Sequence, residues 1–175
     1  MTGVKTPLGV NYIEELKSVE FKLFSKNAKK VFLCIFDSPV NENPLMELEM
    51  KKIEDDIWIT YVKDYILNCS KRPIFYGYRI FVPNWEYKEN FEEGSKIGFI
   101  SNFDEKGNRF NPNKIAYDPY CRELSHTPGQ IDKAFRSYRS GGEFYLSPSA
   151  KSAPKSVFKQ INLNEIQKIE PRAFS

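Results

Sequence analysis

The stretch Ile74-Phe75-Tyr76-Gly77-Tyr78-Arg79-Ile80-Phe81 is the most strand-like part of this sequence. It is rich in aromatic and β-branched residues, which favour the pleated, half-buried surface of a sheet. Pro83 ends it, because proline has no backbone N–H to donate to a neighbouring strand. The stretch therefore predicts a strand. Aromatic residues make up 15% of the whole chain, so the same preference extends to the rest of the sequence.

Four shorter apolar runs precede this stretch, and polar turns separate them. They span residues 19–23, 31–36, 45–50 and 57–62. In the first run, Val19, Phe21 and Leu23 alternate with Glu20 and Lys22, so one face is expected in a core and the other in water. The second run is apolar on both faces, which predicts a central strand covered on both sides. Five such runs without a helical period predict an all-β sandwich.

The character of the sequence changes after Phe103. Residues 104–114 are polar, rich in turn residues and without a period, which indicates a loop. Residues 130–139 carry apolar side chains on one face and predict one short helix. We therefore expect a β-sandwich over residues 1–105 and a loop-rich, irregular extension containing a short helix over residues 106–175.

Size, charge and cysteine usage exclude several classes of protein. The chain has 175 residues, which is the length of one domain, and a formal net charge of +3 without a block of like charges, so a nucleic-acid partner is not indicated. No stretch approaches the 18 or so apolar residues of a membrane span, and no apolar targeting segment opens the chain. Cys34, Cys69 and Cys121 are odd in number and far apart, which disfavours a disulfide framework or a zinc site. We expect a soluble protein of a reducing compartment, the cytoplasm, that contacts no membrane.

Residues that could carry catalysis are not grouped in any known pattern. His126, the only histidine, follows Ser125, but a triad needs a third group and an oxyanion hole. A histidine that hydrogen-bonds locally at a turn is the favoured interpretation. The doublets Asp55-Asp56 and Glu92-Glu93 are expected in solvated turns, because adjacent strand residues point to opposite faces and make no acid and base pair. The residues thus predict no catalytic site, no cofactor and no metal.

The aromatic residues after the main strand allow a binding role. Trp85 and Tyr87 follow Pro83 directly, which predicts a loop at the edge of the sandwich. An exposed aromatic ring there could stack on the apolar face of a sugar, with neighbouring polar groups bonding its hydroxyls. The alternative is that Trp85 closes one end of the core, as a buried tryptophan does in many small sandwiches. Trp58, inside a predicted strand, is expected in the core.

An ordered set of motifs resembles a known family. The set begins with Pro7-Leu8-Gly9, Phe75-Tyr76-Gly77-Tyr78-Arg79 with Pro83, and Gly98-Phe99, and continues with residues 107–114, Tyr117-Asp118-Pro119-Tyr120, residues 123–126 and residues 152–157. In this order the motifs are similar to the N-terminal part of isoamylase-type glycogen debranching enzymes of the α-amylase superfamily. The resemblance implies an immunoglobulin-like β-sandwich, grouped with the carbohydrate-binding modules of glycogen and starch enzymes, that packs against a following (β/α)8 barrel.

The chain departs from this family in two ways. Val82 stands where the family has glycine before Pro83, which bears on how the chain turns there. The catalytic motifs lie on the barrel, which needs about 250 residues, whereas only about 50 follow His126. No catalytic residue can therefore be assigned, and we expect an excised or truncated accessory domain.

The resemblance also implies partners and contact residues. The partners would be an α-glucan and the catalytic barrel of the parent chain, an α-1,6-glucosidase that acts on glycogen. The candidate barrel contacts are Asn108, Arg109, Phe110, Asn111, Asp118 and His126. Such a domain would either position branched chains or cover one side of the barrel and stabilise it. The alternative is a stand-alone immunoglobulin-like domain that binds a protein partner, because a sandwich fold does not by itself imply a function.

Overall fold

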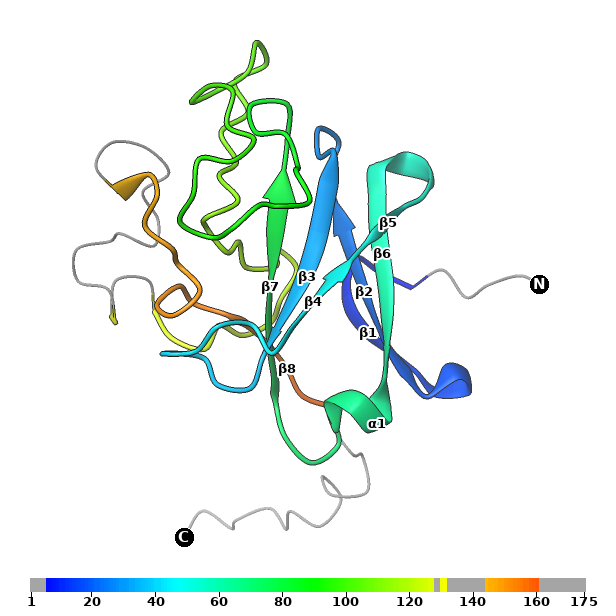
Figure 1. Ribbon diagram of the computed structural model, residues 1–175. Helices are drawn as coiled ribbons and strands as arrows, with labels where there is room; N and C mark the ends of the chain where they lie inside the picture. The colour runs from blue at the N-terminus through cyan, green and yellow to red at the C-terminus, as the bar shows by residue number, and fades with distance from the viewer. Residues whose placement is uncertain (1–5, 128–129, 132–143, 161–175) are drawn as a thin grey trace, which may run out of the picture.

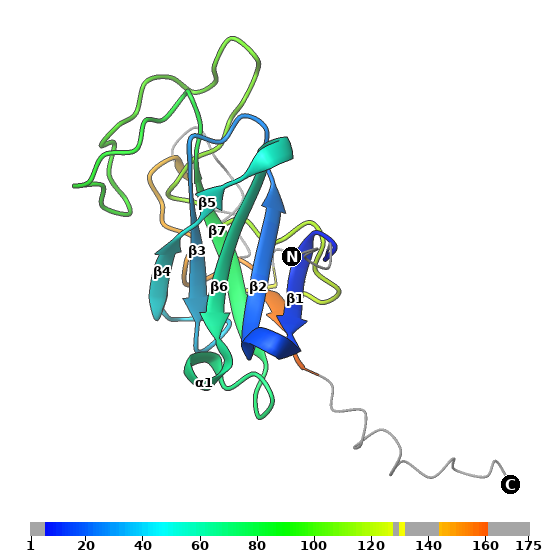
Figure 2. The same ribbon diagram turned by 90° about the vertical axis from the view of Figure 1, so that its right-hand side faces the viewer.

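Two antiparallel four-stranded sheets form the centre of the computed structural model, which describes residues 6–127, 130–131 and 144–160 (Figure 1; Figure 2 shows it turned by 90°). The first sheet has the order β1 (Gly9–Ile13), β2 (Ser18–Phe24), β6 (Ile57–Lys63), β5 (Lys51–Lys52). The second has the order β4 (Met46–Glu49), β3 (Lys30–Phe36), β7 (Ile74–Phe81), β8 (Ser156–Phe158). Short helical turns span Glu14–Leu16, Glu54–Asp56 and Asp64–Leu67, the last being α1. The all-β prediction is confirmed, and each of the five predicted strands is present.

The core lies between the two sheets and contains the side chains predicted for it, but the prediction that Glu20 faces water is wrong: Glu20 is 4% exposed and accepts a hydrogen bond from the Tyr61 hydroxyl over 2.8 Å. Val19, Phe21 and Leu23 of β2 are at most 4% exposed and face the second sheet. Tyr76 of β7 meets Phe21 edge to face, with ring centroids 5.1 Å apart. Trp58 is buried as expected, and its indole N–H donates to the Ser25 carbonyl over 3.1 Å. Burial of every second side chain along these strands therefore holds the two sheets face to face.

A layer of loops covers the outer face of the second sheet. Cys34 and Phe36 of β3 pack there against Ile115 and Ala150, far along the chain. In Figure 1 these loops lie on the side of β7 that faces away from β1, β2 and β6. This third layer explains why β3 is apolar on both faces, and it confirms the prediction of a central strand covered on both sides.

Gly77 in the middle of β7 allows the loop layer to approach the strand closely. The Tyr78 amide donates to the Ala116 carbonyl over 2.7 Å, and the Ala116 amide donates back to the Tyr78 carbonyl over 2.9 Å. A Cβ atom at Gly77 would lie 2.9 Å from the Ala116 carbonyl oxygen and would press on Ile115. The strand interior thus uses glycine for close backbone approach.

Three short strands are not anticipated by the sequence pattern. β1 and β5 are edge strands, and β8 pairs with β7 so that Ile74 lies opposite Phe158 and Tyr76 opposite Ser156. β8 belongs to the segment expected to be an irregular extension, and it completes the second sheet. The short helix predicted over residues 130–139 lies outside the described residues except at its first two positions. Among the described residues, no helix is long and apolar enough to span a membrane.

Candidate functional site: the loop layer and the cleft beside it

Trp85 lies inside the loop layer. Its side chain is 0% exposed, its indole N–H donates to the Ile97 carbonyl over 2.7 Å, and its ring stacks on Tyr145 with centroids 5.2 Å apart. Phe99 packs against the same two rings. The expectation of an exposed sugar platform is therefore corrected at Trp85, because the chain folds back over the indole. Its burial agrees with the alternative in which this tryptophan fills an apolar core.

Tyr87 lies at the edge of the same layer and is half-buried. Its ring packs against Phe32 and Phe81, with centroids 5.3 and 5.2 Å away. The Lys30 ammonium lies 4.9 Å from the centre of the Tyr87 ring, within cation–π range. The protein itself thus occupies much of the surface that a sugar would use at Tyr87.

Val82 and Asn84 direct the chain from β7 into the loop layer. Val82 is fully buried, and its carbonyl accepts a hydrogen bond from the Trp85 amide over 2.8 Å, so the chain turns here without a glycine. The Asn84 side-chain amide donates to the carbonyls of Ser101 and Phe110, each over 3.2 Å. Asn84 therefore fixes the position of the loop that contains residues 101–110.

Arg79 joins the loop layer to the second sheet. Its guanidinium is 3% exposed and contacts Glu47 at 2.9 Å and Glu93 at 3.3 Å. It also donates to the Pro112 carbonyl. A charged residue between apolar strand positions is a signal that sequence analysis could have used, because a buried charge needs partners. The sequence did not reveal what those partners would be.

The predicted contact residues Asn108 to Asn111 follow one another along the loop layer. The side-chain Oδ1 of Asn108 accepts from the Asn27 side chain over 3.0 Å, and the side-chain Nδ2 of Asn108 donates to the Asp104 carboxylate over 2.6 Å. These hydrogen bonds from Asn108 hold the pKa of Asp104 below its usual value. Arg109 and Phe110 are exposed, whereas Asn111 is buried and its amide donates to the Tyr145 carbonyl over 2.8 Å. This segment therefore presents two of its four side chains to the surface.

Asp118 and His126 lie elsewhere and do not join that group. Asp118 is 0% exposed, and its carboxylate accepts from the Tyr76 hydroxyl and from the Tyr120 amide, each over 2.8 Å. Burial raises the pKa of Asp118. His126 is within hydrogen-bond distance of the Ser125 hydroxyl, 3.0 Å from Nδ1, and of the Ser152 carbonyl, 3.1 Å from Nε2. The predicted local hydrogen bond of His126 is thus present, and Asp118 supports the fold from within.

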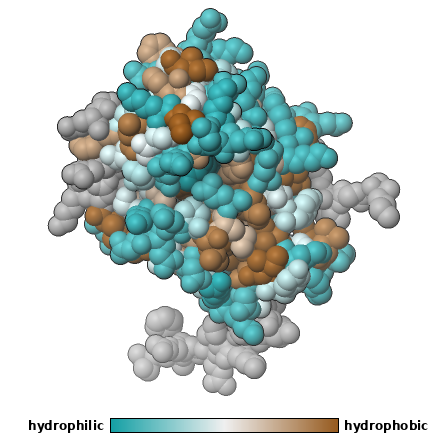
Figure 3. Space-filling model, viewed as in Figure 1, coloured by the Kyte–Doolittle hydropathy of each residue, from teal (hydrophilic) through white to brown (hydrophobic). Residues whose placement is uncertain are grey.

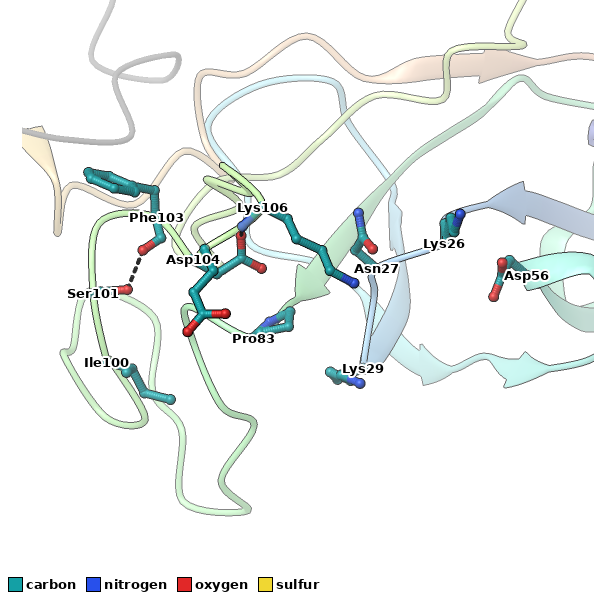
Figure 4. A pocket seen from close by; sticks show the side chains of 11 residues that line it. Lys26, Asn27, Lys29, Asp56, Pro83, Ile100, Ser101, Phe103, Asp104 and Lys106 are labelled. Carbon is teal, nitrogen blue, oxygen red and sulfur yellow. Dashed lines mark hydrogen bonds between the residues drawn. The ribbon is translucent and has the colours of Figure 1, made fainter.

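A cleft of about 600 Å³ separates the loop layer from the turn between β2 and β3 (Figure 4). Its lining combines charged, amide and apolar side chains: Lys26, Asn27, Lys29, Asp56, Pro83, Ile100, Ser101, Phe103, Asp104, Glu105 and Lys106. Ile100 and Phe103 are 62% and 60% exposed. The volume falls in the range of small-molecule sites. Sequence analysis missed this cleft because the turn and the loop are about 75 residues apart.

The chemistry of the cleft is that of noncovalent binding. Asp56 is paired with Lys52 at 2.7 Å, and Asp104 accepts the backbone amides of Lys106 and Asn108 over 2.9 Å each. Both carboxylates therefore already have partners within the protein. In the part of the chain that the structure describes, no group of three or more histidine, cysteine or acidic residues could hold a metal ion.

Comparisons with known proteins agree with the fold. Residues 7–121 match the model of a family described as carbohydrate-binding module 48, the isoamylase N-terminal domain. The chain is 34% identical to an isoamylase from Flavobacterium sp over 155 residues, which are 86% of this chain and 20% of that protein. It is 31% identical to a glycogen debranching enzyme from Salmonella typhi over 89% of this chain and 19% of that protein.

The similarity of this chain to solved structures is one of fold. The chain superposes with a TM-score of 0.55 on a product complex of the multi-modular glycogen-degrading pneumococcal virulence factor SpuA. The match covers 98% of this chain and 13% of that one, at 18% identity. The chain thus spans about a fifth or less of the proteins that it matches.

Proposed function

Since the chain belongs to the carbohydrate-binding module 48 family of isoamylase N-terminal domains, we propose that it is the non-catalytic, glycan-associated module of an enzyme that debranches glycogen. The reaction of the parent enzyme would be hydrolysis of α-1,6 branches in a separate barrel. The names of the relatives support this reading, because they are isoamylases and a glycogen debranching enzyme. The family match favours this function over the alternative of a stand-alone protein-interaction domain.

The observation that carries the proposal is the extent of the family match. The matched residues 7–121 include the strands as far as β7 and also the loop layer from Val82 to Cys121. Buried Arg79 of the second sheet donates to the Pro112 carbonyl of that layer, and buried Asn111 joins two parts of the layer by donating to the Tyr145 carbonyl. We propose that residues 106–175 lead from the sandwich toward the catalytic barrel.

The exposed apolar residues of the loop layer support a contact with that barrel. Ile100, Phe103 and Phe110 are 62%, 60% and 41% exposed, and Arg109 beside them is exposed as well. Figure 3 shows apolar side chains over the loops at the top of the view. Exposed apolar patches mark interaction surfaces. We propose that this surface contacts the barrel or the glucan on which the barrel acts.

Two experiments test the proposed function. The source gene, read past the codon for Ser175, is expected to continue into a barrel of about 250 residues. The 175-residue chain is expected to migrate more slowly in a gel that contains glycogen than in a plain gel, with serum albumin as the unretarded control. A gene that ends at Ser175 would contradict the debranching enzyme, and unretarded migration would contradict glycan binding. The chain alone is expected to release no reducing sugar from branched glucan.

The cysteines support a reducing compartment for this enzyme. Cys34, Cys69 and Cys121 are all free, and the first two are buried. Burial raises the pKa of Cys69 to about 12, so this thiol stays protonated and unreactive at neutral pH. We propose that the parent enzyme works in the cytoplasm.

A further inference from the structure

We infer that the cleft between the turn at residues 26–29 and the loop at residues 100–106 binds a segment of neutral α-glucan chain. This inference rests on the proposed function and names its glucan site. The cleft differs from the surface expected around Trp85, which the structure fills with protein side chains. Its walls come from three separate parts of the chain: the β2–β3 turn, Asp56 before β6, and the loop that follows Pro83.

One wall of the cleft is apolar. Ile100 and Phe103 keep more than half of their side-chain surface exposed, and Pro83 lies beside them. The loop backbone that carries them is fixed: the Ile100 amide donates to the Asn84 carbonyl over 3.1 Å, and the Ser101 hydroxyl donates to the Phe103 carbonyl over 2.6 Å. In Figure 4 the Phe103 ring points away from the turn at residues 26–29, so Ile100 and Pro83 supply the apolar side chains of this wall, against which the C–H face of a glucose ring can pack.

The charged groups favour a polyhydroxylated neutral ligand over an anion. Lys26, Lys29 and Lys106 make no ion pair with any described residue, so their ammonium groups are available as donors. The lining also holds three carboxylates, on Asp56, Asp104 and Glu105, and Asp56 is paired with Lys52 outside the lining at 2.7 Å. The carboxylates of Asp104 and Glu105, next to Lys106 in the sequence, repel an anion. Balanced donors and acceptors beside an apolar wall fit sugar hydroxyls.

Hydrogen bonds already hold the two sides of the cleft in place. The Ser25 amide donates to the Asp56 carbonyl over 3.0 Å and joins the two turns. The Asn27 side chain donates to the Asn108 side chain, which donates to Asp104. These two hydrogen bonds connect the turn to the loop. In Figure 4 the Lys106 side chain extends from the loop toward Asn27. A site fixed before binding loses less conformational entropy when a ligand enters.

The test is calorimetric titration of the 175-residue chain with maltoheptaose. Ile100→Ala and Lys106→Gln are each expected to weaken binding severalfold, the first because an apolar contact is lost and the second because a charged donor is lost. The controls are Tyr65→Ala, which removes an aromatic ring that is 83% exposed on α1, and Lys71→Gln, an exposed lysine near the same end. Both controls are expected to keep full affinity. Thermal unfolding of each variant checks that it folds.

The possible outcomes distinguish a failure of the proposed cleft from a failure of the proposed glycan-binding function. Wild-type binding that Ile100→Ala and Lys106→Gln leave unchanged would overturn the cleft as the site and leave the proposed function standing. A wild-type chain that binds neither maltoheptaose nor glycogen would overturn both. Titration with inorganic phosphate is a third measurement, and phosphate binding tighter than maltoheptaose binding, lost in Lys106→Gln, would contradict the neutral ligand.

Discussion

The backbones of Gly98 and Glu86 lie directly against each other. The Glu86 amide donates to the Gly98 carbonyl over 2.8 Å, and a Cβ atom at Gly98 would overlap the Glu86 carbonyl oxygen. Gly98 has a φ of +78°, which residues with a side chain rarely adopt. This contact closes the loop over Trp85, and it is the physical reason for the glycine in the Gly98-Phe99 motif.

Replacing this glycine is expected to disrupt the loop layer. Gly107 has the same φ of +78°, but nothing lies within 4 Å of its added Cβ. Gly107→Ala should therefore cost only the strain of the left-handed backbone, about 1–2 kcal/mol in the free energy of unfolding. Gly98→Ala adds the overlap with Glu86 and should cost clearly more. Denaturant unfolding of both variants measures the difference, and equal losses would show that the close approach contributes nothing.

Arg79 is expected to contribute far more to stability than an exposed arginine. Arg79→Met leaves Glu47 and Glu93 without their shared partner, and because these carboxylates are only partly buried, the cost should lie below the roughly 3–5 kcal/mol of a fully buried pair. Arg72 forms an exposed ion pair with Asp37, so Arg72→Met should cost at most about 1 kcal/mol. The midpoints of urea unfolding compare the two. Similar midpoints would mean that Arg79 is not a structural link between sheet and loops.

Lys155 is expected to make stability rise with pH just above pH 8. Its side chain is 0% exposed, its ammonium lies 4.6 Å from the centre of the Phe36 ring, and burial lowers its pKa to about 8. In the unfolded chain the pKa returns to its ordinary 10.5, so between these values the unfolded state binds more protons. Stability should then rise with pH by up to about 1.4 kcal/mol per pH unit.

The control for Lys155 is the variant Lys155→Met, which removes the ammonium group and keeps an unbranched side chain that is one atom shorter. Glu93 and Cys34 are the titratable groups that act on the Lys155 charge. Burial raises the pKa of the Cys34 and Cys69 thiols above the ordinary 9.0, so above pH 9 they oppose the rise in both proteins. The difference in unfolding free energy between wild type and variant isolates Lys155. A difference that stays constant between pH 7 and pH 9 would rule out this titration.

Trp85→Phe is expected to lower stability without changing glucan affinity. The variant loses the hydrogen bond to the Ile97 carbonyl and leaves that buried acceptor unpaired, at a cost of about 1–3 kcal/mol. Its ring can still pack between Tyr145 and Phe99. Thermal unfolding measures the stability, and maltoheptaose titration well below the melting temperature measures the affinity. A large loss of glucan affinity in the folded variant would show that Trp85 contributes to glucan binding.

The candidate site could be predicted only in part. The loop containing Asn108 was singled out from its motif, yet its hydrogen bond to Asn27 joins residues 81 positions apart. Trp85 was placed correctly after the main strand, whereas its exposure depended on Tyr145, 60 positions later. Ile100, Phe103 and the three cleft lysines carry no sequence signal, because exposed lysines and single apolar loop residues are common on all surfaces.

The sequence by itself determined the strands β2, β3, β4, β6 and β7 and the two-sheet core, because alternation and β-branched or aromatic residues are local properties of each strand. The short strands β1, β5 and β8 depended on pairing with those five. It also determined the family, since the motifs lie in a fixed order along the chain. Only the tertiary structure decided which faces are open. The pattern of β3 shows that both its faces are covered, but the cover comes from Ile115 and Ala150, which no local pattern connects to β3. Burial of Trp85, the partners of Arg79 and the cleft depend on such distant contacts, whose free energy appears only when the whole chain has folded.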